Sequence, residues 1–244
     1  MRPALGEVHV WYRRTESLDE VDVSADVVVL NADERARLER FVFQRDRRDF
    51  AAAHALLRRV LSFYESVPPS AWRFTARALG KPAIVSTQAG HPPLRFNLSH
   101  TDGLVACVVA RDVEVGIDVE RISHASSDRD LARQCFTARE IEHLDACEPD
   151  ERMHRFVELW TLKESYLKAL GTGLYGELKS FSFEFGRDRT LTFHPPPGDR
   201  RPWQFALAAP TACHHLAVSL CEKRGLRCRT LFLMPRVAGA RCAS

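Results

Sequence analysis

The sequence predicts an α+β fold in which two similar subdomains follow one another as a pseudo-twofold tandem repeat. Two observations support this prediction. A strand pattern, a capped helix start and a long helix recur in the same order about 106 positions apart. The 244 residues, 45% of them hydrophobic, also suffice for one or two compact domains. We therefore expect each half to pack a small antiparallel sheet on one long helix.

The repeated elements can be followed along the chain. An alternating strand pattern at 7–11 returns at 114–118, and long helices are expected at 50–59 and 156–170. A capping box precedes each helix, and the two boxes are formed by Asn31 with Glu34 and by Thr137 with Glu140. Further strands are expected at 72–76, 94–97, 104–110, 181–185, 190–193, 204–208 and 215–220. The resulting division is a subdomain at 1–111, a subdomain at 112–222 and a basic, loosely held tail at 223–244.

The composition excludes several classes of protein. No run of apolar residues approaches the roughly 18 to 20 that a membrane span needs, and the N-terminus lacks the apolar stretch of a signal peptide. The net charge of +3 is too small for a protein that wraps nucleic acid. The seven cysteines are scattered and include no C-x-x-C pair. We expect a cytoplasmic protein with free thiols, without a membrane or nucleic-acid partner.

Lysine is rare in this chain, which has 30 arginines and 5 lysines. Lysine offers a compact ammonium that contacts phosphate as a point charge and can release a proton, which arginine does not readily do. Each lysine is therefore a candidate for chemistry that arginine would not perform.

The segment 115–120, VGIDVE, places two carboxylates on one side of a strand. Because side chains alternate along a strand, Asp118 and Glu120 project together, away from the apolar face. Gly116 lies on the same side and is expected to leave room for a ligand. The alternative is an ordinary polar face on a half-buried strand.

A third carboxylate lies on the second long helix. Glu164 and Lys168 are four residues apart and share one face, with Lys163 beside them. The alternative here is a surface ion pair. Three carboxylates from the strand and the helix would form an oxygen site of the kind that Mg²⁺ prefers, and the lysines would meet phosphate groups at the same place.

Two further clusters lie in the first half. Lys81 is in a turn within Gly80-Lys81-Pro82, and Asn97-Leu98-Ser99-His100 ends a strand. Two observations argue against Ser99 and His100 as a nucleophile and its base: sequence neighbours seldom form such a pair, and no G-x-S-x-G elbow is present. A phosphate-binding histidine is the better interpretation. The absence of P-loop and G-x-G-x-x-G motifs argues against an ordinary nucleotide hydrolase or a Rossmann enzyme.

Together these residues resemble a known family. Gly116-Ile117-Asp118-Val119-Glu120 with Trp160-x-x-Lys163-Glu164-Ser165-x-x-Lys168 is similar to the paired signature of Sfp-type 4′-phosphopantetheinyl transferases. The Gly80-Lys81-Pro82 and Asn97-x-Ser99-His100 segments match upstream motifs of that family. The resemblance implies a Mg²⁺-dependent transfer of the 4′-phosphopantetheine arm of coenzyme A to a serine of an apo acyl or peptidyl carrier protein, with release of adenosine 3′,5′-bisphosphate.

The resemblance also implies a role for each matched residue. Asp118, Glu120 and Glu164 would hold Mg²⁺, Glu164 would act as the general base, and Lys168 would assist the leaving side. The expected contacts to coenzyme A come from Arg37, Lys81, Ser99, His100 and Lys163. Arg37, alone or with Arg40, stands where the family has more basic residues, and His54 replaces a common arginine. A tandem chain of this kind is expected to be a monomer with its site in the cleft between the halves.

Two other functions are compatible with parts of the pattern. One is a catalytically silent module that binds coenzyme A or a carrier protein, although such a module would not need three convergent carboxylates. The other is a metal-dependent phosphohydrolase acting on coenzyme A. The sequence does not identify the carrier protein or its pathway, and segment 123–136 is expected to meet the acceptor.

Overall fold

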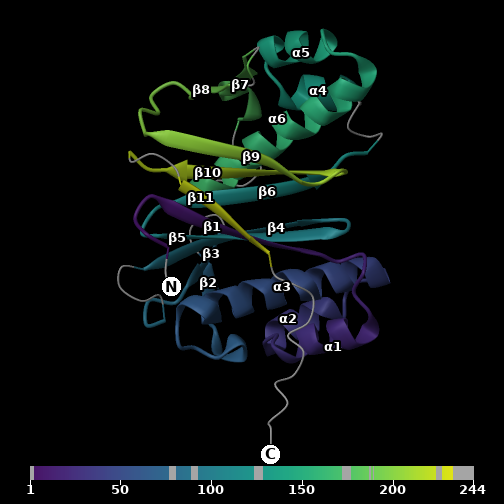
Figure 1. The fold of residues 1–244 in the computed structure, drawn as a ribbon, viewed down its shortest axis with the longest axis vertical. Helices are drawn as coiled ribbons and strands as arrows, with labels where there is room; N and C mark the ends of the chain where they lie inside the picture. The colour runs from purple at the N-terminus through teal and green to yellow at the C-terminus, as the bar shows by residue number, and fades with distance from the viewer. Residues whose placement is uncertain are drawn as a thin grey trace, which may run out of the picture.

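Two β-sheets pack face to face in the middle of the protein, and helices cover the outer face of each sheet (Figure 1). The computed structural model describes residues 3–76, 81–88, 93–123, 129–171, 177–186, 188, 190–223 and 227–232. The layer between the sheets is apolar and fully buried, and its side chains come from β1, β5, β6 and β10. Both halves of the chain therefore share one core layer.

The first sheet has the strand order β11-β1-β5-β4. Its members are β1 (Glu7–Arg14), β4 (Leu94–Thr101), β5 (Leu104–Arg111) and β11 (Arg227–Phe232). On its outer face lies the long helix α3 (Gln44–Tyr64), whose buried alanines allow a close approach to β5. The smaller elements around this helix are α1 (Glu20–Val28), α2 (Ala32–Leu38), η1 (Pro69–Ala71) and the hairpin of β2 (Phe74–Ala76) with β3 (Pro82–Ile84).

The second sheet has the strand order β6-β10-β9 and is antiparallel throughout. Its members are β6 (Val115–Arg121), β9 (Trp203–Thr211) and β10 (His214–Cys221). The long helix α6 (Pro149–Leu170) lies on its outer face. The remaining elements pack around this helix and are α4 (Arg129–Cys135), α5 (Ala138–Asp145), η5 (Leu178–Ser180), β7 (Ser182–Phe185) and β8 (Leu191–His194). No helix in the described ranges is long and apolar enough to cross a membrane.

The prediction of an α+β architecture with small antiparallel sheets is confirmed, and so are both capping boxes. Asn31 accepts the amide of Glu34 at 2.8 Å, and Thr137 accepts that of Glu140 at 3.3 Å. The tail departs from expectation, because residues 227–232 form β11 and pair in parallel with β1. A strand that adds to the edge of a sheet gains backbone hydrogen bonds that basic composition does not reveal.

Gly116 does not face a ligand space, so the expectation about it was wrong. A β-carbon at this position would lie 2.0 Å from the carbonyl oxygen of Ser165 and 2.5 Å from the amide nitrogen of Ala169. The room beside Gly116 is filled by the backbone of α6, which therefore packs directly on β6. In the same contact the hydroxyls of Ser165 and Ser219 are 2.5 Å apart.

Lys163 is part of the second core and cannot contact phosphate, contrary to expectation. Its side chain is fully buried, and its ammonium lies 2.9 Å from Glu140 and donates to the carbonyl oxygens of Leu178 and Phe181 at 2.7 and 2.8 Å. Burial lowers the pKa of Lys163, and the negative charge of Glu140 opposes that shift. Glu140 also accepts the amide of Phe183 at 3.0 Å, so this ion pair joins α5, α6 and β7.

We predict that Gly116→Ala lowers the free energy of unfolding by about 3 kcal/mol or more, because the methyl group must push α6 off β6. Chemical denaturation of the purified variants measures this. The matched control is Gly198→Ala, where φ is +89° and no atom lies within 4 Å of the added carbon. That control should cost only about 1 kcal/mol. Equal effects at both positions would contradict the packing explanation.

We predict that Lys163→Met lowers the free energy of unfolding by roughly 3 to 5 kcal/mol, since Glu140 would remain buried without its cation. The same substitution at the exposed Lys179 provides the control and should change stability by less than about 0.5 kcal/mol. A Lys163→Met variant of normal stability with a raised KM for coenzyme A would instead restore the phosphate-contact interpretation.

Candidate functional site

The three predicted carboxylates lie where β6 passes between β4 and α6. Asp118 and Glu120 project from β6 toward the helix, and Glu164 comes from α6 itself. Asp118 is 2% exposed and Glu164 8% exposed. The ammonium of Lys168 lies 2.5 Å from Asp118 Oδ1 and donates to Ser99 Oγ at 2.9 Å. The structure therefore brings residues 99, 118 and 168, which are distant in sequence, into one hydrogen-bonded group.

The carboxylates influence one another's protonation. Burial and the negative charge of Asp118 raise the pKa of Glu120 to about 7, although Lys168 and a hydrogen bond from Thr101 partly oppose the shift. Burial and Asp118 likewise raise the pKa of Glu164, with Lys168 again opposing. An opposite charge nearby would favour the ionised form of both glutamates. The carboxyl groups of Asp118, Glu120 and Glu164 are thus concentrated in a buried site, where the ammonium of Lys168 compensates part of their negative charge.

The residues present fit a bound cation, although they are not arranged as a finished cage. No group of three or more His, Cys, Asp or Glu side chains in the described ranges is placed to hold a metal ion as it stands. However, Asp118 Oδ2 and Glu164 Oε1 are both buried and have no hydrogen-bond partner among the residues that the structure describes. A buried carboxylate oxygen without a donor is costly unless something else neutralises it. Oxygen donors of this type suit Mg²⁺.

A group of basic side chains of the first half lies within electrostatic reach of Lys168 through His100. Partial loss of hydration lowers the pKa of His100. The negative charge of Asp49 opposes this shift, whereas Lys168, His54 and Arg37 lower the pKa further. Arg37, His54 and Lys168 are therefore within electrostatic reach of His100. Next to them is a hollow of about 650 Å³ lined by Asp33, Ala36, Arg37, Arg40 and Phe41. The predicted phosphate contacts Arg37 and His100 are thus within electrostatic reach of each other and of Lys168, which contacts Asp118.

Other arginines of the first half are used internally. Arg58 is fully buried and forms an ion pair with Glu34 at 2.8 Å. Burial alone would raise the pKa of Glu34, but hydrogen bonds from His54, Arg58 and the Asn31 amide outweigh it and hold this pKa at about 2. His54 contacts Glu34 at 2.9 Å and so belongs to the same cluster. These side chains hold α2 against α3, which positions Arg37.

Lys81 has a structural contact in place of the predicted phosphate contact. Its ammonium donates to the carbonyl oxygens of Val115 and Ala169 at 3.2 and 2.9 Å and to Glu114 at 3.1 Å. Ala169 is in the last turn of α6, where carbonyl oxygens lack helical partners. Lys81 thus ties the first half to the start of β6 and the end of α6. Gly80 beside it and the glycine and threonine at 172–173 lie outside the described residues.

Ser99 is in the site, but its contacts are within the protein. Its hydroxyl donates to Asp118 Oδ1 at 2.9 Å and accepts the amide of Val119 at 3.3 Å. No role was assigned to Asn97 from the sequence, although it lies in the recognised motif, and Thr101 on the same strand was not singled out. Asn97 accepts the amide of Ile117 at 2.9 Å, and Thr101 donates to Glu120 at 3.3 Å. The alternation of polar residues at 97, 99 and 101 was the available signal.

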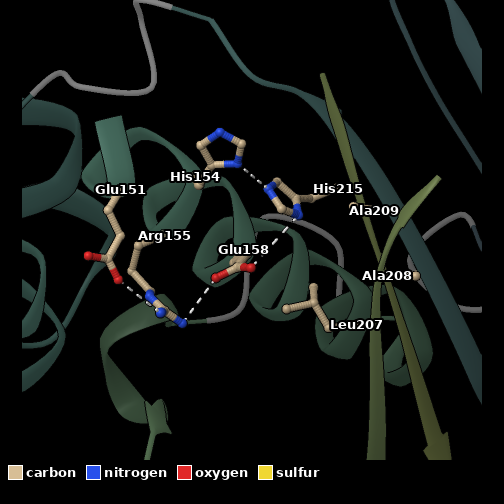
Figure 2. A pocket seen from close by; sticks show the side chains of 8 residues that line it. All are labelled: Glu151, His154, Arg155, Glu158, Leu207, Ala208, Ala209 and His215. Atoms are coloured by element: carbon tan, nitrogen blue, oxygen red, sulfur yellow. Dashed lines mark hydrogen bonds and ion pairs between the residues drawn. The ribbon is translucent and has the colours of Figure 1, made fainter. Parts of the chain in front are cut away.

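A second hollow lies between the N-terminal half of α6 and strand β9 (Figure 2). Its volume is about 440 Å³, and in it His154 Nδ1 is 3.1 Å from His215 Nε2 while Arg155 forms ion pairs with Glu151 and Glu158. None of the predicted site residues lines it. Residues 124–128, within the segment 123–136 that is expected to meet an acceptor, lie outside the described residues, and α4 begins at Arg129.

Family models match nearly the whole chain. Residues 114–221 match the 4′-phosphopantetheinyl transferase superfamily, and residues 19–112 match the 4′-phosphopantetheinyl transferase N-terminal domain. Among solved structures, a holo-(acyl-carrier-protein) synthase from Bacillus anthracis aligns with 44% of this chain and 95% of its own at a TM-score of 0.40 and 13% identity. That likeness is too weak to bear on the function of this chain.

Curated relatives agree with the family models. The 4′-phosphopantetheinyl transferase HetI of Nostoc sp. is 36% identical over 168 residues, which are 69% of this chain and 70% of the relative. The 4′-phosphopantetheinyl transferase Sfp of Bacillus subtilis is 30% identical over 68% of this chain and 71% of its own length. The 4′-phosphopantetheinyl transferase psf-1 of Bacillus pumilus is 30% identical over 78% of this chain and 84% of its own length. The resemblance seen in the sequence motifs is thereby confirmed, and the chain belongs to the Sfp-type 4′-phosphopantetheinyl transferases.

Proposed function

We propose that this protein transfers the 4′-phosphopantetheine arm of coenzyme A to a serine of an apo carrier protein and depends on Mg²⁺. The reaction forms a bond between the serine oxygen and the phosphorus that carries the pantetheine arm, and it breaks the bond to the leaving adenosine 3′,5′-bisphosphate. The observation that carries this proposal is the pair of unpartnered buried oxygens on Asp118 and Glu164, set beside Lys168 and the basic group of the first half.

Each side chain of the site has a defined task in this reaction. Asp118, Glu120 and Glu164 would hold Mg²⁺, which when bound neutralises charge on the diphosphate. Glu164, whose pKa is raised by burial, takes the proton of the attacking serine hydroxyl. Lys168 places its positive charge beside the phosphates and stabilises the leaving side. The Ser99 hydroxyl holds the side chains of Asp118 and Lys168 next to each other, because it forms a hydrogen bond with each.

The basic group of the first half supports binding of coenzyme A. Arg37 and Arg40 line one hollow, and Arg37 lies 5.4 Å over the ring of Phe50. In this proposal the two arginines and His100 receive the 3′-phosphate end of coenzyme A, because guanidinium groups match phosphate oxygens in pairs. The substrate then lies across the cleft, with its diphosphate at the carboxylates.

We also infer that the two halves are tandem copies of one plan and that the protein acts as a monomer. The capping boxes at Asn31 and Thr137 open α2 and α5, and a long helix follows each. With both halves in one chain, the basic group and the carboxylates face each other without a second subunit. This supports a single site between the halves.

Transfer itself is tested by mass spectrometry of an apo carrier protein incubated with the protein, coenzyme A and Mg²⁺. A mass gain of one phosphopantetheine arm is expected. Asp118→Ala and Glu164→Gln should each lower kcat by about 10² to 10⁴. Ser99→Ala should weaken transfer by about 10- to 100-fold, because it removes the hydrogen bonds with Asp118, Lys168 and the Val119 amide but leaves all three carboxylates in place. No mass gain on several different carriers would exclude the proposed function, and a loss with Ser99→Ala as large as with Asp118→Ala would indicate a serine nucleophile.

We predict that Arg37→Ala raises the KM for coenzyme A by about tenfold, the amount expected from one lost charge-assisted hydrogen bond. The KM for dephospho-coenzyme A, which lacks the 3′-phosphate, should change less than twofold. Arg45→Ala is the control, because Arg45 is exposed and pairs only weakly with Asp46 at 3.3 Å. An equal change for both substrates would place the 3′-phosphate elsewhere.

A further inference from the structure

The contact between the two halves has an unusual form at the carboxylates. Strand β6 is an edge strand of its sheet, bonded to β10 on one side only. Its other edge lies along β4, which belongs to the first sheet. The amides of Ile117 and Val119 point to this edge and need acceptors, because a buried backbone N–H is rarely left unpaired. No backbone ladder between β4 and β6 supplies them.

Side chains of β4 supply the acceptors instead. Asn97 Oδ1 accepts the amide of Ile117 at 2.9 Å, and Ser99 Oγ accepts that of Val119 at 3.3 Å. The two residues of each pair are 20 positions apart in the sequence. Alternate side chains of β4 therefore accept hydrogen bonds from alternate backbone amides of β6. This pairing defines how far β6 can slide along β4.

The two bonded amides flank Asp118. Ile117 and Val119 are its immediate neighbours, and their side chains are fully buried between the sheets. The apolar layer between the sheets holds the halves together but has no direction of its own. The Asn97 and Ser99 hydrogen bonds are directional, so they determine where the Asp118 carboxylate stands relative to Lys168 and Glu164. Asn97 is 6% exposed, and its side-chain oxygen binds the backbone of β6 and not a carboxylate of the site.

We propose that Asn97 is a positioning residue for the transfer reaction, acting through the Ile117 amide to hold Asp118 in place. This inference rests on the proposed function, since it concerns the same site. Among the described residues Asn97 hydrogen-bonds the Ile117 amide and forms no hydrogen bond to the carboxylates or the basic group, so its effect would pass through the β6 backbone. Losing the acceptor oxygen frees β6 at Ile117 and lets Asp118 shift out of line with Glu164.

The experiment compares two substitutions of similar size. Asn97→Leu removes the acceptor, whereas Asn97→Asp keeps an acceptor oxygen at the same place. Three quantities are measured on the full chain: hydrogen exchange of the Ile117 amide by NMR, Mg²⁺ affinity by calorimetry, and kcat and KM with coenzyme A and an apo carrier protein. The melting temperature of each variant is recorded beside them.

For Asn97→Leu we expect faster exchange at Ile117, about tenfold weaker Mg²⁺ binding and a kcat lower by roughly 100-fold, the loss typical of a 1 Å misplacement. The KM for coenzyme A should change less than twofold, because the basic group of the first half is untouched. Asn97→Asp should recover slow exchange at Ile117 and most of the Mg²⁺ affinity and kcat. If Asn97→Leu does not fold, Asn97→Ser, whose shorter side chain also withdraws the acceptor from Ile117, is measured against Asn97→Asp.

Two outcomes overturn the inference. One is faster exchange or a lower melting temperature in Asn97→Leu with unchanged Mg²⁺ affinity and kcat, which would make Asn97 merely structural. The other is an Asn97→Asp variant as impaired as Asn97→Leu in all three measurements. If the wild-type protein transfers nothing, the proposed function fails, and Ile117 exchange with Mg²⁺ affinity still decides whether Asn97 positions the carboxylates.

Discussion

The backbone contact between β6 and α6 at Gly116 is the constraint on which the site depends. Any side chain at this position would occupy the space of the Ser165 carbonyl, so only glycine allows the helix to lie directly on the strand. That closeness brings Glu164 of the helix within electrostatic reach of Asp118 two residues farther along β6. The Ser165–Ser219 hydrogen bond and Lys81 at the helix end support the same contact. A helix standing farther off would separate the carboxylates.

Bringing the carboxylates together has a cost for the folded protein. The pKa of Glu120 is raised from 4.5 to about 7, so the folded protein favours the protonated form of this side chain. The stabilisation from this protonation is complete below the pKa of the unfolded chain and is lost as the pH rises through about 7. Lys168 offsets part of the repulsion by its contact with Asp118, yet within the described part of the chain Asp118 Oδ2 and Glu164 Oε1 have no hydrogen-bond donor. A bound divalent cation would relieve both deficits. The strain is therefore concentrated where the proposed chemistry needs charge, which is common at functional sites.

Local patterns predicted much of this arrangement, and contacts between distant segments account for the rest. Strand alternation placed Asp118 and Glu120 together, and helical spacing placed Glu164 with Lys168. The same helix geometry turns Lys163 away, because five residues from Lys168 amount to roughly 140° of rotation. A sequence does not say which helical face meets the strand, so both lysines looked equally suited to phosphate. Gly116 posed the same difficulty, since room for a ligand and room for a helix look alike in one chain.

The two kinds of contact between the halves do different work. The apolar layer of β1, β5, β6 and β10 excludes water and resists separation, but it would tolerate small shifts of one sheet over the other. The polar residues of β4 do not tolerate them, because each hydrogen bond requires one alignment of β6. Reaction geometry demands placement within fractions of an ångström, which non-directional packing alone does not provide. Polar residues at an otherwise apolar boundary are thus explained by the alignment of Asp118.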